Sequence, residues 1–284
     1  MCQAARMARH LDTGSDDLLA RVEGNVGIIT FNRPDRRNAL SNGIYDGFAA
    51  ALPDLAADST VSVVMVTGNG GAFCAGGDVK GMHEANSSGG TREGQPSGIE
   101  DRLAFLRKRQ RQLSLALHEF PKPVIAALPG AAAGAGLSIA LAADIRLAAE
   151  RAIVVTAFAN VGASGDFGGS WFLTQLVGTA KAKELYFTSP RLSAEEALDL
   201  GIVNQVLPDE GFDEAALAWC QSMAERAPIA LRYMKENLNR ALHADLATAL
   251  DAEAAAMVRT MGTADHREAA AAFVEKRRPN FTGE

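Results

Sequence analysis

Two glycine-rich turns constrain the fold of this chain more than any other feature. They occupy residues 70–78 and 129–136, and each follows a short apolar run, 61–67 and 123–128, that predicts a buried strand. Each turn also precedes a predicted helix, and such turns leave backbone N–H groups unpaired. Glycines at these positions are also typical of tight packing alone, but two such turns in one chain favour a catalytic interpretation. If the two turns lie side by side, their N–H groups could bind one oxygen atom that becomes negatively charged during a reaction.

The net charge and the apolar pattern exclude several classes of protein. A net charge of −6 argues against a general nucleic-acid-binding or membrane-binding surface. No apolar run is long enough to span a bilayer, because the Ala-rich segment 124–141 is interrupted by Pro129 and by several glycines. We therefore expect a small-molecule substrate, with no nucleic acid and no membrane as partner.

The cysteines and the N-terminal segment indicate the compartment. Cys2, Cys74 and Cys220 are scattered and odd in number, which is typical of a reducing cytoplasm and predicts neither disulfides nor a metal site. Residues 1–17 contain arginines but lack the apolar segment of a signal peptide. We expect a cytoplasmic protein with a flexible N-terminal tail.

The sequence pattern changes character once along the chain. Up to about Pro208, β-like runs alternate with helical segments, which predicts an α/β architecture with crossover connections. After Pro208 the pattern is almost wholly helical and rich in alanine, which predicts an assembly module. The expected organisation is a tail over 1–17, a catalytic core over 18–208 and a helical assembly region over 209–284.

The same periodicity predicts the individual elements. Ser41 is expected to cap the first helix and Pro279 to end the last one. Predicted strands occupy residues 18–31 (two strands, split by a turn at 23–25), 61–67, 123–128, 145–149 and 153–156. Predicted helices occupy residues 38–56, 136–143, 213–226, 228–243, 246–261 and 265–278.

Five ordered motifs resemble one protein family. The second of them reads AFCAGGDVK, and the five occupy residues 32–41, 72–80, 122–144, 192–203 and 272–281. The resemblance as a whole extends from about Leu18 to the C-terminus. In this order and spacing they resemble the enoyl-CoA hydratase/isomerase (crotonase) superfamily. The resemblance implies a spiral of ββα turns followed by a C-terminal helical trimerisation region, assembled as trimers or dimers of trimers.

The resemblance also implies a substrate carried as a thioester of coenzyme A. Coenzyme A then enters as part of the substrate and is not a permanently bound cofactor. In the family two backbone N–H groups bind the thioester oxygen, and their positions match Gly77 and Ala135. Removing a proton next to a thioester passes through an enolate, and two preorganised donors stabilise its oxygen.

Four further residues match family positions around coenzyme A. Ala75 matches the position whose backbone meets the adenine, and Lys80 matches one near the phosphates. Lys276 matches a position that reaches the coenzyme A of a neighbouring subunit, with Phe273 as an apolar contact. Solvated surface lysines are the alternative interpretation for Lys80 and Lys276.

The positions that hold the catalytic water in hydratases carry other residues here. Hydratases of the family hold one water between two glutamates, and the matching positions carry Ser138 and Phe158. Neither side chain acts as a general acid or base near neutral pH, and the phenyl ring should expel the water. The sequence therefore predicts little or no hydratase activity.

One carboxylate stands where isomerases of the family carry a catalytic aspartate. Asp166 begins the pattern Asp-x-Gly-Gly-Ser-Trp, which resembles dienoyl-CoA isomerases and the ring-epoxide CoA isomerases of phenylacetate breakdown. Beside Phe158, Phe167 and Trp171 it should be poorly solvated, with a raised pKa that suits a base. In this interpretation Asp166 takes a proton from C2 of the acyl group and returns it at C4.

Other interpretations fit the same residues. Asp166 also fits a turn or helix-capping aspartate ahead of glycines. The chain also fits an enoyl-CoA hydratase (lyase) of fatty-acid or aromatic-acid catabolism, or an acyl-CoA-binding homologue without catalysis. Cys74 is expected to be a small buried thiol and not a nucleophile. The cationic run 107–111 is expected to be a solvated helix face.

Overall fold

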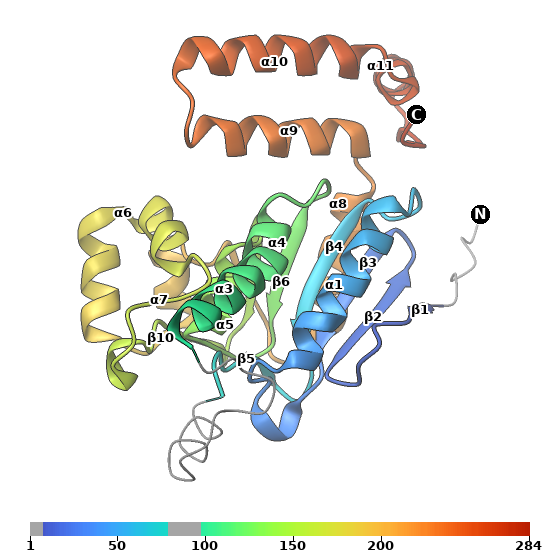
Figure 1. The fold of residues 1–284 in the computed structure, drawn as a ribbon. Helices are drawn as coiled ribbons and strands as arrows, with labels where there is room; N and C mark the ends of the chain where they lie inside the picture. The colour runs from blue at the N-terminus through green and yellow to red at the C-terminus, as the bar shows by residue number, and fades with distance from the viewer. Residues whose placement is uncertain (1–7, 79–97) are drawn as a thin grey trace.

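The larger of two β-sheets forms the centre of the molecule (Figure 1). The computed structural model describes residues 8–78 and 98–284. The first three strands of the sheet pair antiparallel and the remaining ones parallel. In sheet order the strands are β1 (Arg9–Leu11), β2 (Leu18–Glu23), β3 (Val26–Phe31), β4 (Val63–Gly68), β6 (Val124–Leu128), β8 (Ile145–Ala149) and β11 (Gln205–Leu207).

The smaller sheet leads into the two glycine-rich turns. Its strands, in sheet order, are β10 (Leu192–Ser193), β9 (Ile153–Val155), β7 (Ala131–Ala133) and β5 (Ala72–Cys74). Successive turns of the chain give one strand to each sheet, β4 then β5, β6 then β7, and β8 then β9, before a helical segment follows. This spiral of ββα turns confirms the α/β fold predicted from the sequence.

The helices form close to where the sequence pattern predicts them. α1 (Asn42–Ala57) begins after the Ser41 cap, whose Oγ accepts the N–H of Ile44 at 3.2 Å. None of the described helices is long and apolar enough to cross a membrane. The other helical segments are η1 (Pro34–Arg36), α3 (Ile99–Gln110), η2 (Arg111–Leu115), α4 (Ala116–His118), α5 (Ala135–Leu141), η3 (Ala159–Val161), α6 (Gly169–Thr188), α7 (Ala194–Asp199), α8 (Phe212–Ala224), α9 (Pro228–Ala241), α10 (Leu246–Met261) and α11 (Ala264–Glu275).

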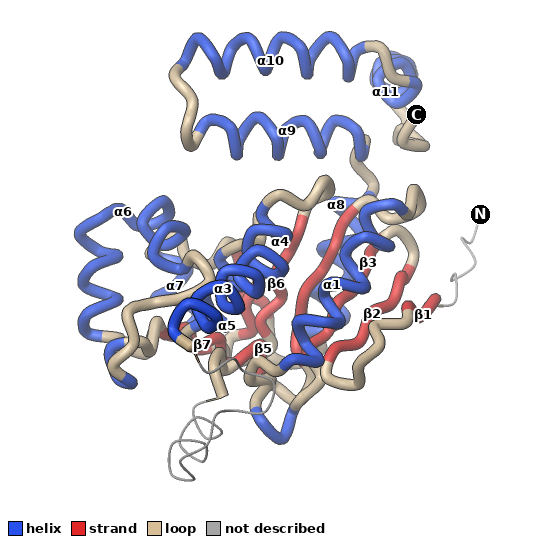
Figure 2. The backbone as a smooth tube through the Cα atoms, in the orientation of Figure 1, coloured by secondary structure: helices blue, strands red, loops and turns tan. Residues whose placement is uncertain are grey.

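Alternate side chains of the larger sheet enter two separate apolar cores. Ile29 and Val64 point into the core that contains the buried face of α1. Their neighbours Ile28 and Val63 point to the other face, where Phe212 of α8 packs against them. The strands thus separate α1 from α8 (Figure 2). This division follows from the two-residue period of a β-strand.

The limits of the core differ from those predicted. α8 packs on the larger sheet, whereas α9, α10 and α11 form a separate layer at one end of the molecule (Figure 1, Figure 2). At the other boundary, β1 lies inside the range 1–17 that was expected to be a flexible tail, and it pairs with β2. The core therefore begins before residue 18, with β1, and continues after residue 208, with α8.

A partly buried ion pair attaches α9 to the core. The Nζ of Lys235 lies 2.8 Å from Oδ2 of Asp144 and also donates to the backbone oxygens of Leu117 and Lys122. The same Asp144 oxygen accepts the N–H of Val124, the first residue of β6, at 2.7 Å. These contacts hold the helical layer against the end of the larger sheet.

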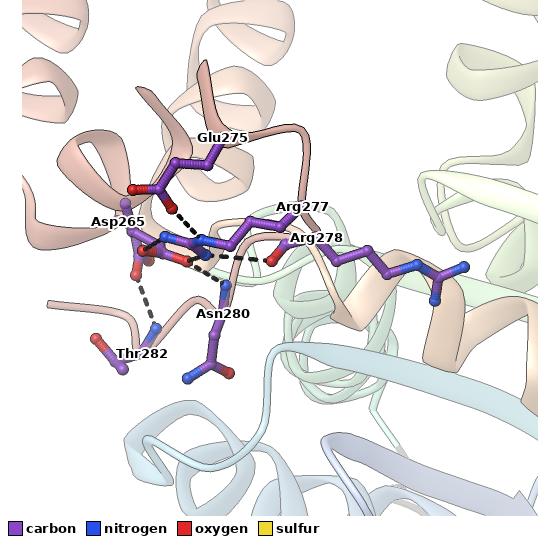
Figure 3. Close-up of polar contacts among 7 residues, drawn as sticks. Asp265, Glu275, Arg277, Arg278, Asn280 and Thr282 are labelled. Atoms are coloured by element: carbon purple, nitrogen blue, oxygen red, sulfur yellow. Dashed lines mark hydrogen bonds and ion pairs between the residues drawn. The ribbon is translucent and has the colours of Figure 1, made fainter. Parts of the chain in front are cut away.

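Ionic contacts hold the C-terminal segment against α11. The guanidinium of Arg277 contacts Glu268 at 2.5 and 2.9 Å and Glu275 at 2.6 Å (Figure 3). α11 ends at Glu275, because Lys276 has a left-handed backbone with φ of 55°. The prediction that this helix continues to residue 278, where Pro279 would end it, is therefore wrong.

Candidate active site

The two glycine-rich turns lie directly against each other. A Cβ added to Gly76, whose φ is 81°, would lie 2.6 Å from the oxygen of Ala133 and 2.9 Å from the nitrogen of Ala135. A Cβ added to Gly136 would lie 2.1 Å from the oxygen of Cys74. Only glycine lets the two backbones approach this closely.

The N–H groups of Gly77 and Ala135 lie on these adjoining turns. Ala135 is the first residue of α5, where an N–H has no acceptor within the helix. Neither N–H has an acceptor elsewhere among the described residues. The first turn is held by the carbonyl of Arg37, which accepts the N–H of Ala75 at 2.9 Å. Two such donors on adjoining turns can bind a single oxygen atom.

Ser138 lies one helical turn after Ala135 on α5. Its side chain is buried, and its Oγ donates to the oxygen of Gly134 at 3.2 Å. α6 begins against this hydroxyl, since a Cβ added to Gly169 would lie 2.2 Å from Ser138 Oγ and 2.7 Å from Tyr186 Oη. The hydroxyls of Ser138 and Tyr186 are therefore neighbours at the start of α6.

Tyr186 is a residue of the site that the sequence reasoning missed. Its ring stacks on Phe158 with centroids 5.8 Å apart and an interplanar angle of 14°. Burial and the nearby carboxylate of Asp166 raise the pKa of Tyr186 to about 12, while a hydrogen bond with Ser138 acts in the opposite direction. The side chain is therefore a neutral phenol at physiological pH. α6 bends at Gly178, where φ is 76° and ψ is 163°, so helical periodicity could not have placed Tyr186 here.

The two carboxylate oxygens of Asp166 have different surroundings. Oδ1 accepts the Nε2 of Gln110 at 2.6 Å and the N–H of Phe167 at 2.7 Å. Oδ2 has no hydrogen-bond partner among the described residues. Burial raises the pKa of Asp166 above its usual value, and the two hydrogen bonds act in the opposite direction. The predicted direction of the pKa shift is confirmed, and Oδ2 can accept a proton from a ligand.

Aromatic packing holds the turn that carries Asp166. Phe167 has a left-handed backbone with φ of 51°, a conformation that is unfavourable for any residue with a side chain. Its ring is buried and stacks on Tyr45, with centroids 6.1 Å apart. Burial of the aromatic ring offsets the backbone strain and fixes the direction of the neighbouring carboxylate.

The cationic run 107–111 is solvated only in part. Arg107, Lys108 and Arg111 are exposed, as the sequence predicted, whereas Arg109 is buried and Gln110 partly buried. Arg109 is only 9% exposed, its guanidinium lies 4.5 Å from the ring centroid of Tyr45, and it contacts Asp46 at 3.1 Å. The next residue, Gln110, holds Asp166. Arg109 and Gln110 therefore contribute to the site, because they lie on the side of α3 that faces α1 and the Asp166 turn.

Trp171 faces a cavity that adjoins the Asp166 turn. The cavity lies between the helical run that ends in α4, the start of α6, and α9, and Phe167 lines it together with Trp171. The Trp171 ring lies 5.5 Å from the ring of His118 and 5.6 Å from that of His243. The structure thus gathers Ser138, Phe158 and Asp166 around Tyr186, and places Trp171 next to this group.

The residues matched to coenzyme A lie far apart in one copy of the chain. Ala75 is on the first glycine turn, two residues before Gly77, whereas Lys80 lies outside the described residues. Phe273, which is 86% exposed, and Lys276 lie on and just after α11. α11 is at the opposite end of the molecule from β5 (Figure 1).

Two other expectations concern Cys74 and metal binding. Cys74 is fully buried, and burial raises the pKa of its thiol to about 12, which confirms a small buried thiol in place of a nucleophile. Within residues 8–78 and 98–284, no group of three or more His, Cys, Asp or Glu side chains is arranged to hold a metal ion.

The fold and the site have counterparts in known proteins. The family described as enoyl-CoA hydratase/isomerase matches residues 21–284. The chain belongs to the enoyl-CoA hydratase/isomerase family. It is 35% identical to 1,2-epoxyphenylacetyl-CoA isomerase of Escherichia coli K12, over 94% of this chain and 98% of that relative. It is 34% identical to the short-chain-enoyl-CoA hydratase of Clostridium acetobutylicum, over 93% and 96% of the two chains.

A solved structure supports the same family membership. The crystal structure of an enoyl-CoA hydratase from Polaromonas sp. JS666 superposes with a TM-score of 0.82 at 36% identity, over 93% of this chain and 99% of that one. Both hydratases and isomerases of the family thus occur among the relatives of this chain. Membership of the family is therefore compatible with either reaction.

Proposed function

We propose that this protein isomerises enoyl-CoA thioesters, with Asp166 as the proton shuttle. The observation that carries the proposal is the Asp166 carboxylate, which is held through Oδ1 while Oδ2 is left to accept a proton. Ser138 and Phe158 stand at the positions matched to the glutamates of hydratases, and neither can activate water. The E. coli relative is an isomerase by name, which supports the same reaction class.

The proposed reaction moves one proton and leaves the atoms of the substrate unchanged. Oδ2 of Asp166 takes a proton from C2 of a 3-enoyl thioester, and the electron pair moves into the conjugated enolate. The N–H groups of Gly77 and Ala135 donate to the enolate oxygen, and loss of one such donor typically costs about 3 kcal/mol. Protonated Asp166 then returns the proton to C4, which moves the double bond from C3–C4 to C2–C3.

Binding of coenzyme A would use residues from two copies of the chain. We assign the adenine contact to the backbone of Ala75 and the phosphate contact to Lys80. Phe273 and Lys276 would reach the coenzyme A of a neighbouring copy, since α11 lies far from the glycine turns of its own chain. The substrate supplies the coenzyme A, and the proposed mechanism needs no resident cofactor.

We also propose assembly as a trimer or a dimer of trimers, in the cytoplasm. Large apolar side chains are exposed on the layer of α9, α10 and α11, among them Leu238, Leu246, Val258 and Val274, each more than 70% exposed. Contact with another copy would bury them. The described cysteines, Cys74 and Cys220, are free and buried, which is compatible with a reducing compartment.

The decisive experiment follows exchange of the C2 proton with deuterated solvent in Asp166→Asn. Asparagine has nearly the same size but cannot accept the proton. We expect exchange and 3-enoyl to 2-enoyl conversion to fall by roughly two to four orders of magnitude, with affinity for acyl-CoA retained. Asp199→Asn, at the exposed end of α7, is the matched control and should behave as wild type. Unchanged exchange in Asp166→Asn would assign the base elsewhere.

Hydration of crotonyl-CoA separates the alternative functions. We expect it to be very slow or absent in the wild-type protein. Turnover approaching that of an ordinary hydratase would refute the isomerase assignment and indicate a water-activating pair outside Ser138 and Phe158. Binding of CoA esters without exchange or hydration would favour an acyl-CoA-binding homologue without catalysis.

A further inference from the structure

The cavity beside Trp171 adjoins the Asp166 turn and is large. Its volume is about 1090 Å³, and its walls come from η2 and α4, the first turn of α6, and α9. Gln110, which holds Oδ1 of Asp166, lines it, as do Phe167 and Gly168 of the same turn. A group that extends past Asp166 on this side would therefore enter the cavity.

One wall of the cavity is aromatic. The rings of His118 and Phe172 stand edge-on to Trp171, with centroids 5.5 and 5.0 Å from that of Trp171, and the ring of His243 lies nearly parallel to it at 5.6 Å. Burial, and next the charge of Lys235, lower the pKa of His118, so its ring is neutral at physiological pH. These flat surfaces suit the methylene groups or the ring of an acyl chain.

A buried hydroxyl in the cavity wall has no hydrogen-bond partner. Ser114 is 4% exposed, and its Oγ makes no hydrogen bond to any described residue. It lies in η2, a π-helical turn between α3 and α4, and such turns occur often at functional sites. An unpaired buried hydroxyl is unfavourable, typically by about 1–3 kcal/mol, and a ligand oxygen in the cavity would supply the missing partner.

The cavity also carries an excess of positive charge. Arg107, Arg111 and Arg240 line it, and none of them forms an ion pair with a described residue. Arg232 and Glu236 also line the cavity and pair with each other at 3.7 Å, and Glu119 is its other acidic residue. Lys235 is already neutralised by Asp144 at 2.8 Å. In a chain with a net charge of −6, three arginines without ion-pair partners, against the one carboxylate of Glu119, leave the cavity positive and indicate an anionic occupant.

We propose that this cavity receives the distal end of the acyl group and selects acyl-CoA thioesters whose acyl chain ends in a carboxylate. The inference rests on the proposed function, which places the reacting carbons at Asp166. The arginines supply charge-assisted hydrogen bonds to the distal carboxylate, Ser114 Oγ donates to it, and the aromatic wall contacts the carbons between the two ends.

The test uses pairs of 3-enoyl-CoA esters of several chain lengths, each made with a methyl end and with a carboxylate end. At the preferred length, we expect kcat/KM of the wild-type protein to be at least about tenfold higher for the carboxylate-ended ester. Arg111→Gln and Ser114→Ala should each reduce this preference severalfold and leave the methyl-ended reaction nearly unchanged. Arg191→Gln, at an exposed arginine outside the cavity, is the matched control.

Two results would overturn the inference. One is equal or better turnover of the methyl-ended esters at every length, which would leave the proposed isomerase function intact. The other is a carboxylate preference that Arg111→Gln and Ser114→Ala do not change, since the preference would then arise elsewhere.

A binding measurement keeps the inference testable if no isomerisation is found. Saturated acyl-CoA esters with a methyl end or a carboxylate end are titrated calorimetrically into wild type and Arg111→Gln. Tighter binding of the carboxylate-ended ester that is lost in Arg111→Gln would support the cavity assignment independently of catalysis. Equal affinities in the wild-type protein would reject it.

Discussion

At the scale of single residues, three contributions set the pKa of Asp166. Burial is the largest and raises it, whereas the hydrogen bonds from Gln110 and from the N–H of Phe167 lower it. A base with a raised pKa binds its proton more tightly, so it removes a C2 proton more readily. The same shift means that Asp166 is ionised only at a higher pH than an exposed aspartate.

Replacement of Gln110 by leucine should move the pH profile of the reaction. Gln110→Leu removes the 2.6 Å hydrogen bond that stabilises the ionised carboxylate, so the pKa of Asp166 should rise further. We expect the acidic limb of the kcat/KM profile to shift to higher pH, with activity on the plateau largely retained. The measurement is C2 proton exchange as a function of pH.

A matched change on another helix controls for loss of an amide group. Gln175→Leu alters an exposed glutamine of α6 that makes no hydrogen bond to a described residue, and its profile should coincide with wild type. An acidic limb that stays in place or moves to lower pH in Gln110→Leu would contradict the assignment of Asp166 as the titrating base.

At the scale of elements, the site depends on how closely two backbone turns approach. β5 and β7 pair in parallel, and the chain after each strand carries one of the two proposed donors, Gly77 and Ala135. One of the closest approaches is at Gly136, where no side-chain atom separates α5 from the backbone of Cys74. The position of the donor pair is therefore a property of the packing between β5 and α5.

A single methyl group at Gly136 should separate the two turns. In Gly136→Ala the new Cβ would lie 2.1 Å from the oxygen of Cys74, and neither backbone can move without disturbing the smaller sheet. We expect the free energy of unfolding to fall by roughly 1–3 kcal/mol, as for other overpacked sites. C2 proton exchange in the folded fraction should fall too, because the two N–H groups no longer converge.

The comparison for this prediction is Gly262→Ala, between α10 and α11. Its Cβ would meet nothing closer than 3.4 Å and its φ is negative, so stability should change by less than about 0.5 kcal/mol. Urea denaturation measures both variants. Equal stabilities for the two would show that the close approach at Gly136 is relieved by relaxation.

At the scale of the whole molecule, the layer of α9, α10 and α11 is only partly integrated with the core. The ion pair between Lys235 and Asp144 attaches α9. Ten large apolar side chains of residues 234–274 are at least 40% exposed, and exposed apolar surface of this kind marks interfaces between proteins. The layer therefore provides the surface through which copies of the chain would associate.

Light scattering at micromolar concentration tests this assembly. We expect the mass of a trimer or a hexamer for the wild-type protein, and a shift toward monomer for Val258→Asp, which places a charge on α10 where the valine is 72% exposed. Ile99→Asp, at a residue 73% exposed at the start of α3, is the matched control and should assemble normally. A monomeric wild-type protein would refute the prediction.

Much of the fold followed from local patterns. The buried runs at β4, β6 and β8 and the cap at Ser41 were predicted close to their observed positions, because strand periodicity and capping act over a few neighbouring residues. The end of α11 was misplaced by three residues, because Lys276 adopts a left-handed turn that ends the helix before Pro279. Helix ends depend on such single-residue conformations.

The sequence by itself determined the family, the glycine turns and the position of Asp166, because each is encoded in residues that are adjacent in the chain. Only the tertiary structure decided the surroundings of Asp166. Gln110 reaches it from 56 residues away, and the bend at Gly178 returns Tyr186 to the same turn. The pKa of a carboxylate depends on burial and on partners distant in the sequence, so no local pattern could have specified it.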